Sequence, residues 1–263
     1  MAIRVGVFGA GGRMGSLVCR TVVADPDLEL VAAIDPFHAG IDLRRVTGAD
    51  VPGMRVSPDA DALELEGAEV AIDFTHVEAA RQNLAWCAAH GVHAVVGTTG
   101  FVEDDYKDVA ARFTTSNCFI APNFAIGAVL MMRFAELAAR YFDSVEIIEL
   151  HHDQKADAPS GTAILTAQRV AAASADWVPD PTQKVVVEGA RGATAAAGIH
   201  IHSVRLRGLV AHQEVLLGTT GQSLSIRHDS YDRSSFMPGV LMAVKAVGNR
   251  PGLTVGLDAL IDV

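Results

Sequence analysis

The sequence is poor in cysteine, and the few cysteines that it has are widely separated. Only Cys19, Cys87 and Cys118 occur among the 263 residues, and no two of them form a Cys-x-x-Cys pair. An odd, sparse set of this kind argues against a disulfide framework and against a structural zinc site, and it is typical of a reducing compartment. We therefore expect a cytoplasmic protein that holds no metal ion.

Long apolar runs and an excess of positive charge are also missing. No apolar stretch approaches the roughly 18 to 20 residues that a membrane-spanning helix needs, and residues 1–9 lead into a strand pattern rather than a signal peptide. Lysine and arginine total 21 against 31 aspartate and glutamate residues, a net charge of −10. So acidic a chain lacks the electrostatic footprint of a nucleic-acid-binding protein. We expect neither a membrane nor a nucleic acid as a partner, and any anionic ligand needs a local group of donors.

The sequence contains enough apolar residues for a sizeable core, and their pattern differs between the first half of the chain and the rest. Half of the residues are hydrophobic and a fifth are charged, which excludes intrinsic disorder. In the first half, apolar runs typical of buried strands alternate with helix-like segments; the runs are 3–8, 28–34, 70–74, 93–96 and 118–121. This alternation predicts an α/β fold with a Rossmann-type doubly wound parallel sheet, covered by helices on both faces. Residues 40–67 give no clear pattern.

The pattern changes after about residue 125. Helices are expected over 128–142 and 162–173 and a strand over 145–150, followed by strand-like runs without intervening helices at 184–187, 199–207, 214–217 and 223–227. Gly-Thr-Thr-Gly at 218–221 separates the last two runs as a hairpin turn would. We predict an inserted α+β domain, residues 126–234, built on a largely antiparallel sheet. A helix over 235–247 and a strand over 253–257 then return the chain to the first domain, which comprises residues 1–125 and 235–263.

A glycine-rich turn joins the first strand to the first helix. It reads Gly9-Ala10-Gly11-Gly12-Arg13-Met14-Gly15, so that the glycines at 9, 12 and 15 follow a Gly-x-x-Gly-x-x-Gly pattern. Glycines in such a turn let backbone N–H groups and the helix N-terminus approach a pyrophosphate. An ordinary glycine-rich turn is the alternative, but the position directly after the first strand is the one that this mechanism requires. We predict that the first domain binds a dinucleotide through residues 9–14.

Other strand ends belong to the same predicted surface. Asp35 follows Gly15 by 20 residues and ends the second strand, where an acid that binds the adenine ribose is expected. Its carboxylate favours NADH, whereas the nearby Arg13 leaves NADPH open. Two loops also follow strands, at the sheet edge where ligands bind: Gly97-Thr98-Thr99-Gly100 and Ala121-Pro122-Asn123-Phe124. A strand-end turn or a plain connection is the alternative explanation of each.

Reactive side chains are concentrated in residues 149–162. This segment reads Glu-Leu-His-His-Asp-Gln-Lys-Ala-Asp-Ala-Pro-Ser-Gly-Thr and opens a predicted helix at its end. N–H groups at a helix start, together with hydroxyls, can bind a carboxylate, while His and Lys can supply positive charge and protons near neutral pH. Taken singly, a histidine pair or a loop lysine is more often structural or solvated. A metal site on His151 and His152 is not expected, because neighbours on a strand point to opposite faces.

The segment resembles the signature Glu-hydrophobic-His-His-x-x-Lys-x-Asp-Ala-Pro-Ser-Gly-Thr of the 4-hydroxy-tetrahydrodipicolinate reductases, also called dihydrodipicolinate reductases. The resemblance covers essentially the whole chain, through the glycine-rich opening, DFT at 73–75, GTTGF at 97–101, APNFAIG at 121–127, GLVAHQEVLLG at 208–218 and RHDS at 227–230. The long signature is highly specific, whereas the glycine turn is not. The resemblance implies an enzyme of diaminopimelate and lysine biosynthesis that transfers hydride from NADH or NADPH to a cyclic dicarboxylate, giving tetrahydrodipicolinate.

The resemblance also implies roles for individual residues. His151 matches a proton donor/acceptor and Lys155 a second proton donor. The positions that match substrate contacts are His152, Gly161 and Thr162, with Ser160 as an additional candidate. The positions that match cofactor contacts are Gly9, Ala10, Gly11, Gly12, Arg13, Met14, Asp35, Gly97, Thr98, Thr99, Ala121, Pro122, Asn123 and Phe124. Pro36 stands where some members carry a basic residue, which favours NADH or dual use.

Members of this family are generally homotetramers joined through the sheet of the second domain, so the resemblance implies a homotetramer whose second domain binds substrate and oligomerises. Two other interpretations remain open. A different Rossmann oxidoreductase, such as an aspartate- or homoserine-type dehydrogenase, would share the glycine turn but would not explain residues 149–162. A non-catalytic NAD-binding sensor or scaffold would need no His/Lys loop and would bind NADH without consuming it.

Overall fold

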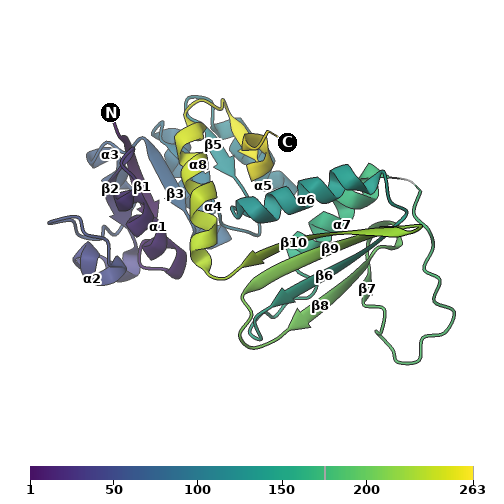
Figure 1. Cartoon of the computed structure of the whole chain (residues 1–263). Helices are drawn as coiled ribbons and strands as arrows, with labels where there is room; N and C mark the ends of the chain where they lie inside the picture. The colour runs from purple at the N-terminus through teal and green to yellow at the C-terminus, as the bar shows by residue number, and fades with distance from the viewer. Residues whose placement is uncertain (175, 263) are drawn as a thin grey trace. The chain divides into compact units, whose positions relative to one another are not determined.

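The computed structural model describes residues 1–174 and 176–262. The chain forms two compact units. Unit 1 comprises Met1–Phe124 with Phe236–Asp262, and unit 2 comprises Ala125–Ser235. Each unit has its own β-sheet (Figure 1).

Unit 1 is built on a six-stranded parallel sheet in the order β11-β5-β4-β3-β1-β2. Its strands are β1 (Ile3–Phe8), β2 (Leu28–Ile34), β3 (Val70–Asp73), β4 (His93–Val96), β5 (Cys118–Ile120) and β11 (Leu253–Val255). The predicted doubly wound parallel sheet is confirmed. The C-terminal strand returns to this sheet as expected, because β11 pairs with β5.

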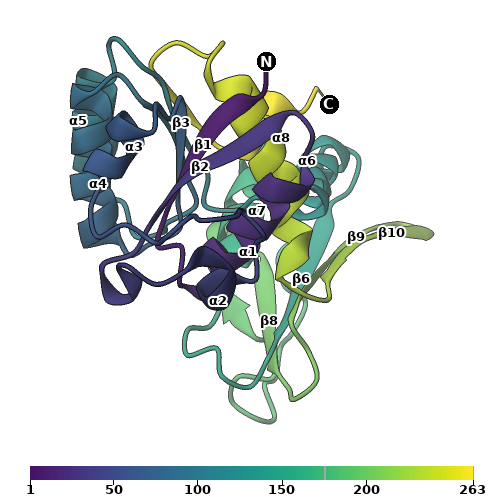
Figure 2. The ribbon, with the colours of Figure 1, turned by 90° about the vertical axis from the view of Figure 1, so that its left-hand side faces the viewer.

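Helices cover both faces of this sheet, which explains why its strands are continuous apolar runs. One face carries α1 (Arg13–Ala24) and α8 (Met237–Val247), and the other carries α3 (Asp61–Leu65), α4 (Val77–Ala89) and α5 (Glu103–Arg112) (Figure 2). A further short helix, α2 (Leu43–Thr47), contacts α1. The segment 40–67, which has no clear sequence pattern, thus contains two helices of five residues each.

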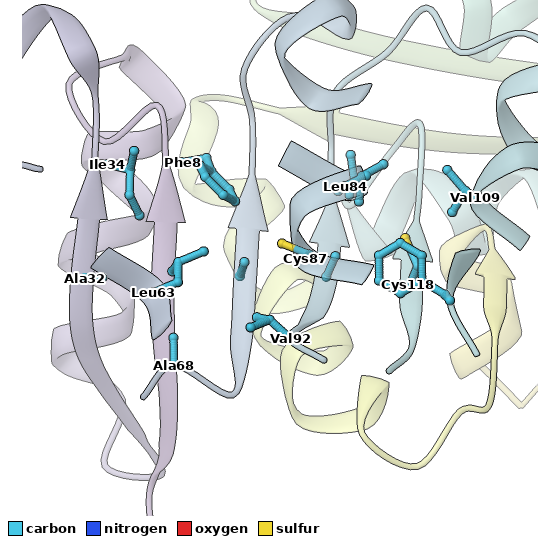
Figure 3. Packing of buried hydrophobic residues seen from close by; sticks show 14 of the residues in the cluster. Phe8, Ala32, Ile34, Leu63, Ala68, Leu84, Cys87, Val92, Val109 and Cys118 are labelled. Carbon is cyan, nitrogen blue, oxygen red and sulfur yellow. The ribbon is translucent and has the colours of Figure 1, made fainter. Parts of the chain in front are cut away.

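The core between the sheet and the second of these helical layers is a continuous apolar cluster (Figure 3). Phe8 and Ile34 project from strands toward Leu63 of α3, while Leu84 of α4 and Val109 of α5 lie further along the sheet. Two of the cysteines belong to this cluster, and all three are buried free thiols. Cysteine therefore serves here as a small apolar residue, as the sparse count predicted.

Unit 2 contains a five-stranded sheet in the order β10-β9-β6-β8-β7. Its elements are α6 (Ile126–Ala139), β6 (Ser144–His151), α7 (Gly161–Ala173), β7 (Ala193–Thr194), β8 (His200–Arg205), β9 (Ala211–Thr219) and β10 (Gln222–Ser230). The pairings of β10 with β9, β9 with β6 and β8 with β7 are antiparallel, and that of β6 with β8 is parallel. The predicted largely antiparallel sheet is confirmed. The predicted hairpin turn is also confirmed, since β9 and β10 are joined at 220–221.

One predicted strand is wrong. Residues 184–187 form no strand, and the side chains of Val185, Val186 and Val187 are exposed. The edge of the sheet beside β8 is taken by the two-residue strand β7 instead. A β-branched run becomes a strand only where a partner strand and a packing surface are available to it, and the described part of the chain provides neither at 184–187.

Candidate active site

The glycine turn of unit 1 has the geometry that its pattern requires. Gly9 adopts a positive φ of 67°, which favours glycine, and its carbonyl accepts the Gly12 amide at 2.9 Å. A Cβ added at Gly15 would overlap the Gly9 carbonyl, so only glycine fits there. Helix α1 begins at Arg13, and the first backbone N–H groups of a helix have no acceptor within the helix. The turn thus presents backbone donors beyond the end of β1.

Asp35 reaches this turn from the end of β2. Its carboxylate is 6% exposed and accepts the Gly11 amide at 2.9 Å and the Phe37 amide at 3.0 Å. His38 lies on the same carboxylate, with Nδ1 at 3.1 Å from Oδ1. Asp35 and Gly11, which are separated by 24 residues, therefore belong to one polar surface.

The loop after β4 is tied to the end of β3 by a buried carboxylate that the sequence interpretation left without a role. Asp73 is 2% exposed and accepts hydrogen bonds from the hydroxyls of Thr75 at 2.7 Å and Thr98 at 3.0 Å. It also accepts the side-chain amide of Asn83 at 2.7 Å. Thr98 thus points into the protein as an anchor of the 97–100 loop. The signal for Asp73 was its position at a strand end in the DFT motif.

Aromatic packing brings the two predicted nicotinamide loops together. Gly97 lies against the ring of Phe74, where a side chain would collide with it. The Phe74 ring in turn packs on Phe124, with centroids 5.8 Å apart. Within these loops Thr99 and Pro122 are exposed, so their surfaces are open to a ligand.

In unit 2, the segment 149–162 is organised around Glu149, whose side chain is fully buried. One carboxylate oxygen lies 2.5 Å from His151 Nδ1, and the other accepts the Ser160 amide at 3.2 Å. The guanidinium of Arg205 binds both oxygens, at 2.9 and 2.8 Å. Glu149 and His151 share a face of β6 because they are two residues apart, and Arg205 lies beside His151 on β8.

The electrostatics of this cluster keep the Glu149 carboxylate ionised. Burial alone would raise its pKa, but hydrogen bonds from His151, Arg205 and Ser203 outweigh burial and lower the pKa of Glu149 to about 2. An ionised carboxylate only accepts hydrogen bonds, so His151 donates its Nδ1–H. The other ring nitrogen, Nε2, is left for a ligand.

Lys155 is held by a second carboxylate. Its Nζ lies 2.7 and 2.8 Å from the two oxygens of Asp157, and this hydrogen bond lowers the pKa of Asp157. Arg205 also donates to the Asp157 carbonyl at 2.7 Å. Arg205 therefore joins the two halves of the segment into one chain of contacts from His151 to Lys155. The sequence interpretation missed this role, because Arg205 is 56 residues from Glu149.

The start of α7 completes the segment. Ser160 is the buried N-cap, and its hydroxyl accepts the Ala163 amide at 3.2 Å. A Cβ added at Gly161 would meet no atom within 4 Å, so there is open space beside the helix N-terminus. Thr162 follows in the first turn. His152, in contrast, is exposed and accepts the Gln154 amide on its Nδ1 at 3.2 Å, apart from the contacts of Glu149.

Metal-binding clusters and membrane-spanning helices are absent from the described residues. Within residues 1–174 and 176–262, no three His, Cys, Asp or Glu side chains are grouped so that they could hold a metal ion. No helix in the same part of the chain has the length and apolarity to cross a bilayer.

These features define the class: a two-domain oxidoreductase with a Rossmann-type sheet. Comparison with known proteins narrows the class. The family model for the N-terminus of dihydrodipicolinate reductase matches residues 3–124, and the model for its C-terminus matches residues 127–261. The chain therefore belongs to the dihydrodipicolinate reductase family.

Individual relatives agree with this assignment. A 4-hydroxy-tetrahydrodipicolinate reductase of Nocardia farcinica is 51% identical with full coverage of both chains, and one of Cutibacterium acnes is 50% identical over 98% of each. The solved structure of a dipicolinate-bound dihydrodipicolinate reductase from Paenisporosarcina sp. TG-14 is 42% identical, with a TM-score of 0.87 over 99% of this chain and 100% of that one. An amine dehydrogenase from Mycobacterium smegmatis, 17% identical with a TM-score of 0.67 over 98% and 96% of the two chains, shares the fold.

Membership of this family confirms the predicted family, the reductase activity and the nicotinamide cofactor, NADH or NADPH. Family membership decides against both alternatives, the aspartate- or homoserine-type dehydrogenase and the non-catalytic NAD-binding protein. The roles of individual residues stay predictions.

Proposed function

We propose that the protein reduces the cyclic dicarboxylate of the 4-hydroxy-tetrahydrodipicolinate reductase reaction to tetrahydrodipicolinate, in diaminopimelate and lysine biosynthesis, with His151 and Lys155 as proton donors. The observation that carries this proposal is the chain of contacts in which Glu149 holds His151, Asp157 holds Lys155, and Arg205 joins the two carboxyl-bearing residues. The dicarboxylate dipicolinate in the structure of the Paenisporosarcina relative supports the substrate class.

The residues of unit 1 fit the cofactor, which supplies the hydride when bound. The cradle at Gly9 and Gly15 leaves no room for side chains, so the backbone donors of the turn and of α1 can approach the pyrophosphate. Asp35 would accept hydrogen bonds from the adenine ribose. The loops 97–99 and 121–124 would hold the nicotinamide end. Unit 1 is thus the proposed dinucleotide-binding domain.

Unit 2 is the proposed substrate domain, and the N-terminus of α7 is its carboxylate site. The open space beside Gly161 admits a carboxylate to the helix amides, which carry the positive end of the helix dipole. Ser160 shapes this helix start as its N-cap. Lys155 can exchange Asp157 for a substrate carboxylate, because the Asp157 side chain is 65% exposed. His152 is a proposed contact at the exposed rim of the loop.

Proton delivery follows from the contacts of His151. Reduction adds electrons to a conjugated ring, and a proton donor held near the ring stabilises the charge that develops. Glu149 fixes the imidazole with Nδ1–H toward the protein, which leaves Nε2 to carry the proton that is exchanged with the substrate, and its anionic charge stabilises the imidazolium.

We also propose that the protein is a cytoplasmic homotetramer joined through unit 2. Helices α6 and α7 contact one face of the five-stranded sheet, and among residues 125–174 and 176–235 no helix covers the other. A second copy of the sheet would cover that face. The three buried, unpaired thiols suit a reducing compartment.

A coupled assay tests the reaction. Pyruvate and aspartate semialdehyde are condensed by the preceding synthase, and the protein is added with NADH and then with NADPH. We expect a synthase-dependent loss of cofactor absorbance, and a reaction without synthase is the control. Folded protein that binds NADH but consumes neither cofactor would refute the substrate assignment.

A further inference from the structure

The site of the adenine ribose contains a histidine that no motif of the chain accounts for. His38 follows Asp35 by three residues, and its Nδ1 lies 3.1 Å from Oδ1 of that carboxylate. A Cβ added at Gly11 would collide with the His38 ring, so the ring lies directly against the glycine turn. The His38 side chain is 39% exposed, so it can be reached from solvent and can move.

The hydrogen-bonding capacity of Asp35 is half filled without a cofactor. An ionised carboxylate offers about four acceptor positions, and two of them accept the Gly11 and Phe37 amides. The Nδ1 of His38 lies 3.1 Å from Oδ1 but is buried and forms no hydrogen bond. A ribose with two free hydroxyls needs the two open acceptor positions, so the His38 ring has to move aside from Oδ1, whereas the two backbone amides can stay.

The 2′-phosphate of NADPH needs a cation instead of an acceptor. It cannot bind to Asp35, because both groups are anionic, and Pro36 provides no charge. His38 is the ring at this position that can carry a positive charge, and Arg13, exposed at the start of α1, can add a second. A protonated His38 that leaves Asp35 can pair with a phosphate at the ribose 2′-position and offset the charge of the carboxylate.

We propose that His38 is the residue that allows this reductase to accept NADPH beside NADH. With NADH the ribose hydroxyls replace His38 on Asp35, and with NADPH His38 binds the 2′-phosphate. This inference rests on the proposed function only in that a nicotinamide cofactor binds to unit 1.

The test compares His38→Asn, which keeps a neutral donor, with His38→Arg, which keeps a positive charge. Dissociation constants for NADH, NADPH and the probe adenosine 2′,5′-bisphosphate are measured by fluorescence titration and by competition. We expect His38→Asn to weaken the binding of NADPH and of the probe by about tenfold or more, the effect of losing one charge-assisted hydrogen bond. NADH binding should stay close to wild type, and His38→Arg should restore or strengthen NADPH binding.

The matched control is His90→Asn. His90 also lies in unit 1 but caps the C-terminal end of α4, where it stacks on Trp86. The His90→Asn variant should change neither the affinity for NADH nor the affinity for NADPH. Equal changes for NADH and NADPH in His38→Asn, no change in either, or a wild-type protein that binds NADH alone would each overturn the inference. Normal binding selectivity without turnover in the coupled assay would instead overturn the proposed function.

Discussion

Replacing Glu149 with Gln tests the central argument about the candidate active site, that a buried anion positions His151. Glutamine has the same shape but no charge, and its NH2 group is a donor where the carboxylate has only acceptors. Arg205 and His151 both donate to this position, so at least one of them loses its partner. The variant therefore changes electrostatics and orientation while it leaves the packing volume nearly unchanged.

The expected loss of stability follows from two independent magnitudes. The pKa of Glu149 is lowered from 4.5 to about 2, which corresponds to about 3 kcal/mol at neutral pH. Breaking a buried ion pair by removing one partner costs about 3 to 5 kcal/mol in other proteins. Both magnitudes predict that Glu149→Gln lowers the free energy of unfolding by about 3 kcal/mol, measured by urea titration at neutral pH.

The expected loss of activity follows from the proposed role of His151. A general acid contributes about 10²- to 10⁴-fold to a rate, and Glu149 would act through that acid. We expect kcat in the coupled assay to fall by about 10²-fold or more, while the dissociation constant for NADH stays close to wild type. The double variant Glu149→Gln/His151→Asn should be no slower than His151→Asn alone, because residues that act as a unit are not additive.

Glu146→Gln is the matched control. Glu146 also lies on β6 and also pairs with a histidine, at 2.6 Å from His202, but it points to the opposite face of the sheet. The Glu146→Gln variant should keep the kcat of the wild type. The reasoning is refuted if folded Glu149→Gln turns over like wild type, or if Glu146→Gln loses as much activity.

Two further variants and one pH series probe the same contacts. Lys155→Met should reduce turnover strongly in the coupled assay while NADH still binds, and full turnover would show that Lys155 is not a proton donor. Asp73→Ala should raise the KM for NADH, because the anchor of Thr98 is lost, and an unchanged KM in a folded variant would contradict the role of that loop. The stabilisation from Glu149 is present above its unfolded pKa of 4.5 and is lost as the pH falls toward about 2, so the stability gap between wild type and Glu149→Gln should narrow over this range in urea titrations. A gap that stays constant from neutral pH into that range would show that the charge of Glu149 does not stabilise the fold.

The parallel sheet could be predicted because its physical cause is local. A strand covered on both faces has to be apolar throughout, and runs such as residues 28–34 and 93–96 have that pattern. Helix and strand ends differ from the predicted ones by a few residues, because terminal turns fray. Where the elements are short, as in α2 and α3, no periodicity can develop, so their residues carry no helical pattern.

The residues of the candidate active site also fall into those that the sequence could reveal and those that it could not. His151, Lys155 and the helix start at Gly161 lie within one short segment, so their pattern is visible in the sequence. The partner that links them is not visible, since Arg205 reaches Glu149 only because β8 pairs with β6. Similarly, the anchoring of Thr98 depends on Asp73, 25 residues earlier. Arg205 and Asp73 were therefore missed because their contacts depend on long-range pairing, which no single segment encodes.

The two carboxylates of the candidate active site, Glu149 and Asp157, differ in burial, and this difference suits them to different roles in the proposed function. Glu149 is fully buried and bound by several donors, so its pair with Arg205 is a fixed part of the fold. Asp157 is 65% exposed, and ion pairs at exposed positions contribute only about 0 to 1 kcal/mol. In the proposed function, a substrate carboxylate would therefore replace Asp157 on Lys155 at little cost, whereas it would not displace Glu149 from His151. In a chain with a net charge of −10, this exchange gives an anionic substrate a local cation without leaving an unpaired lysine in the free enzyme.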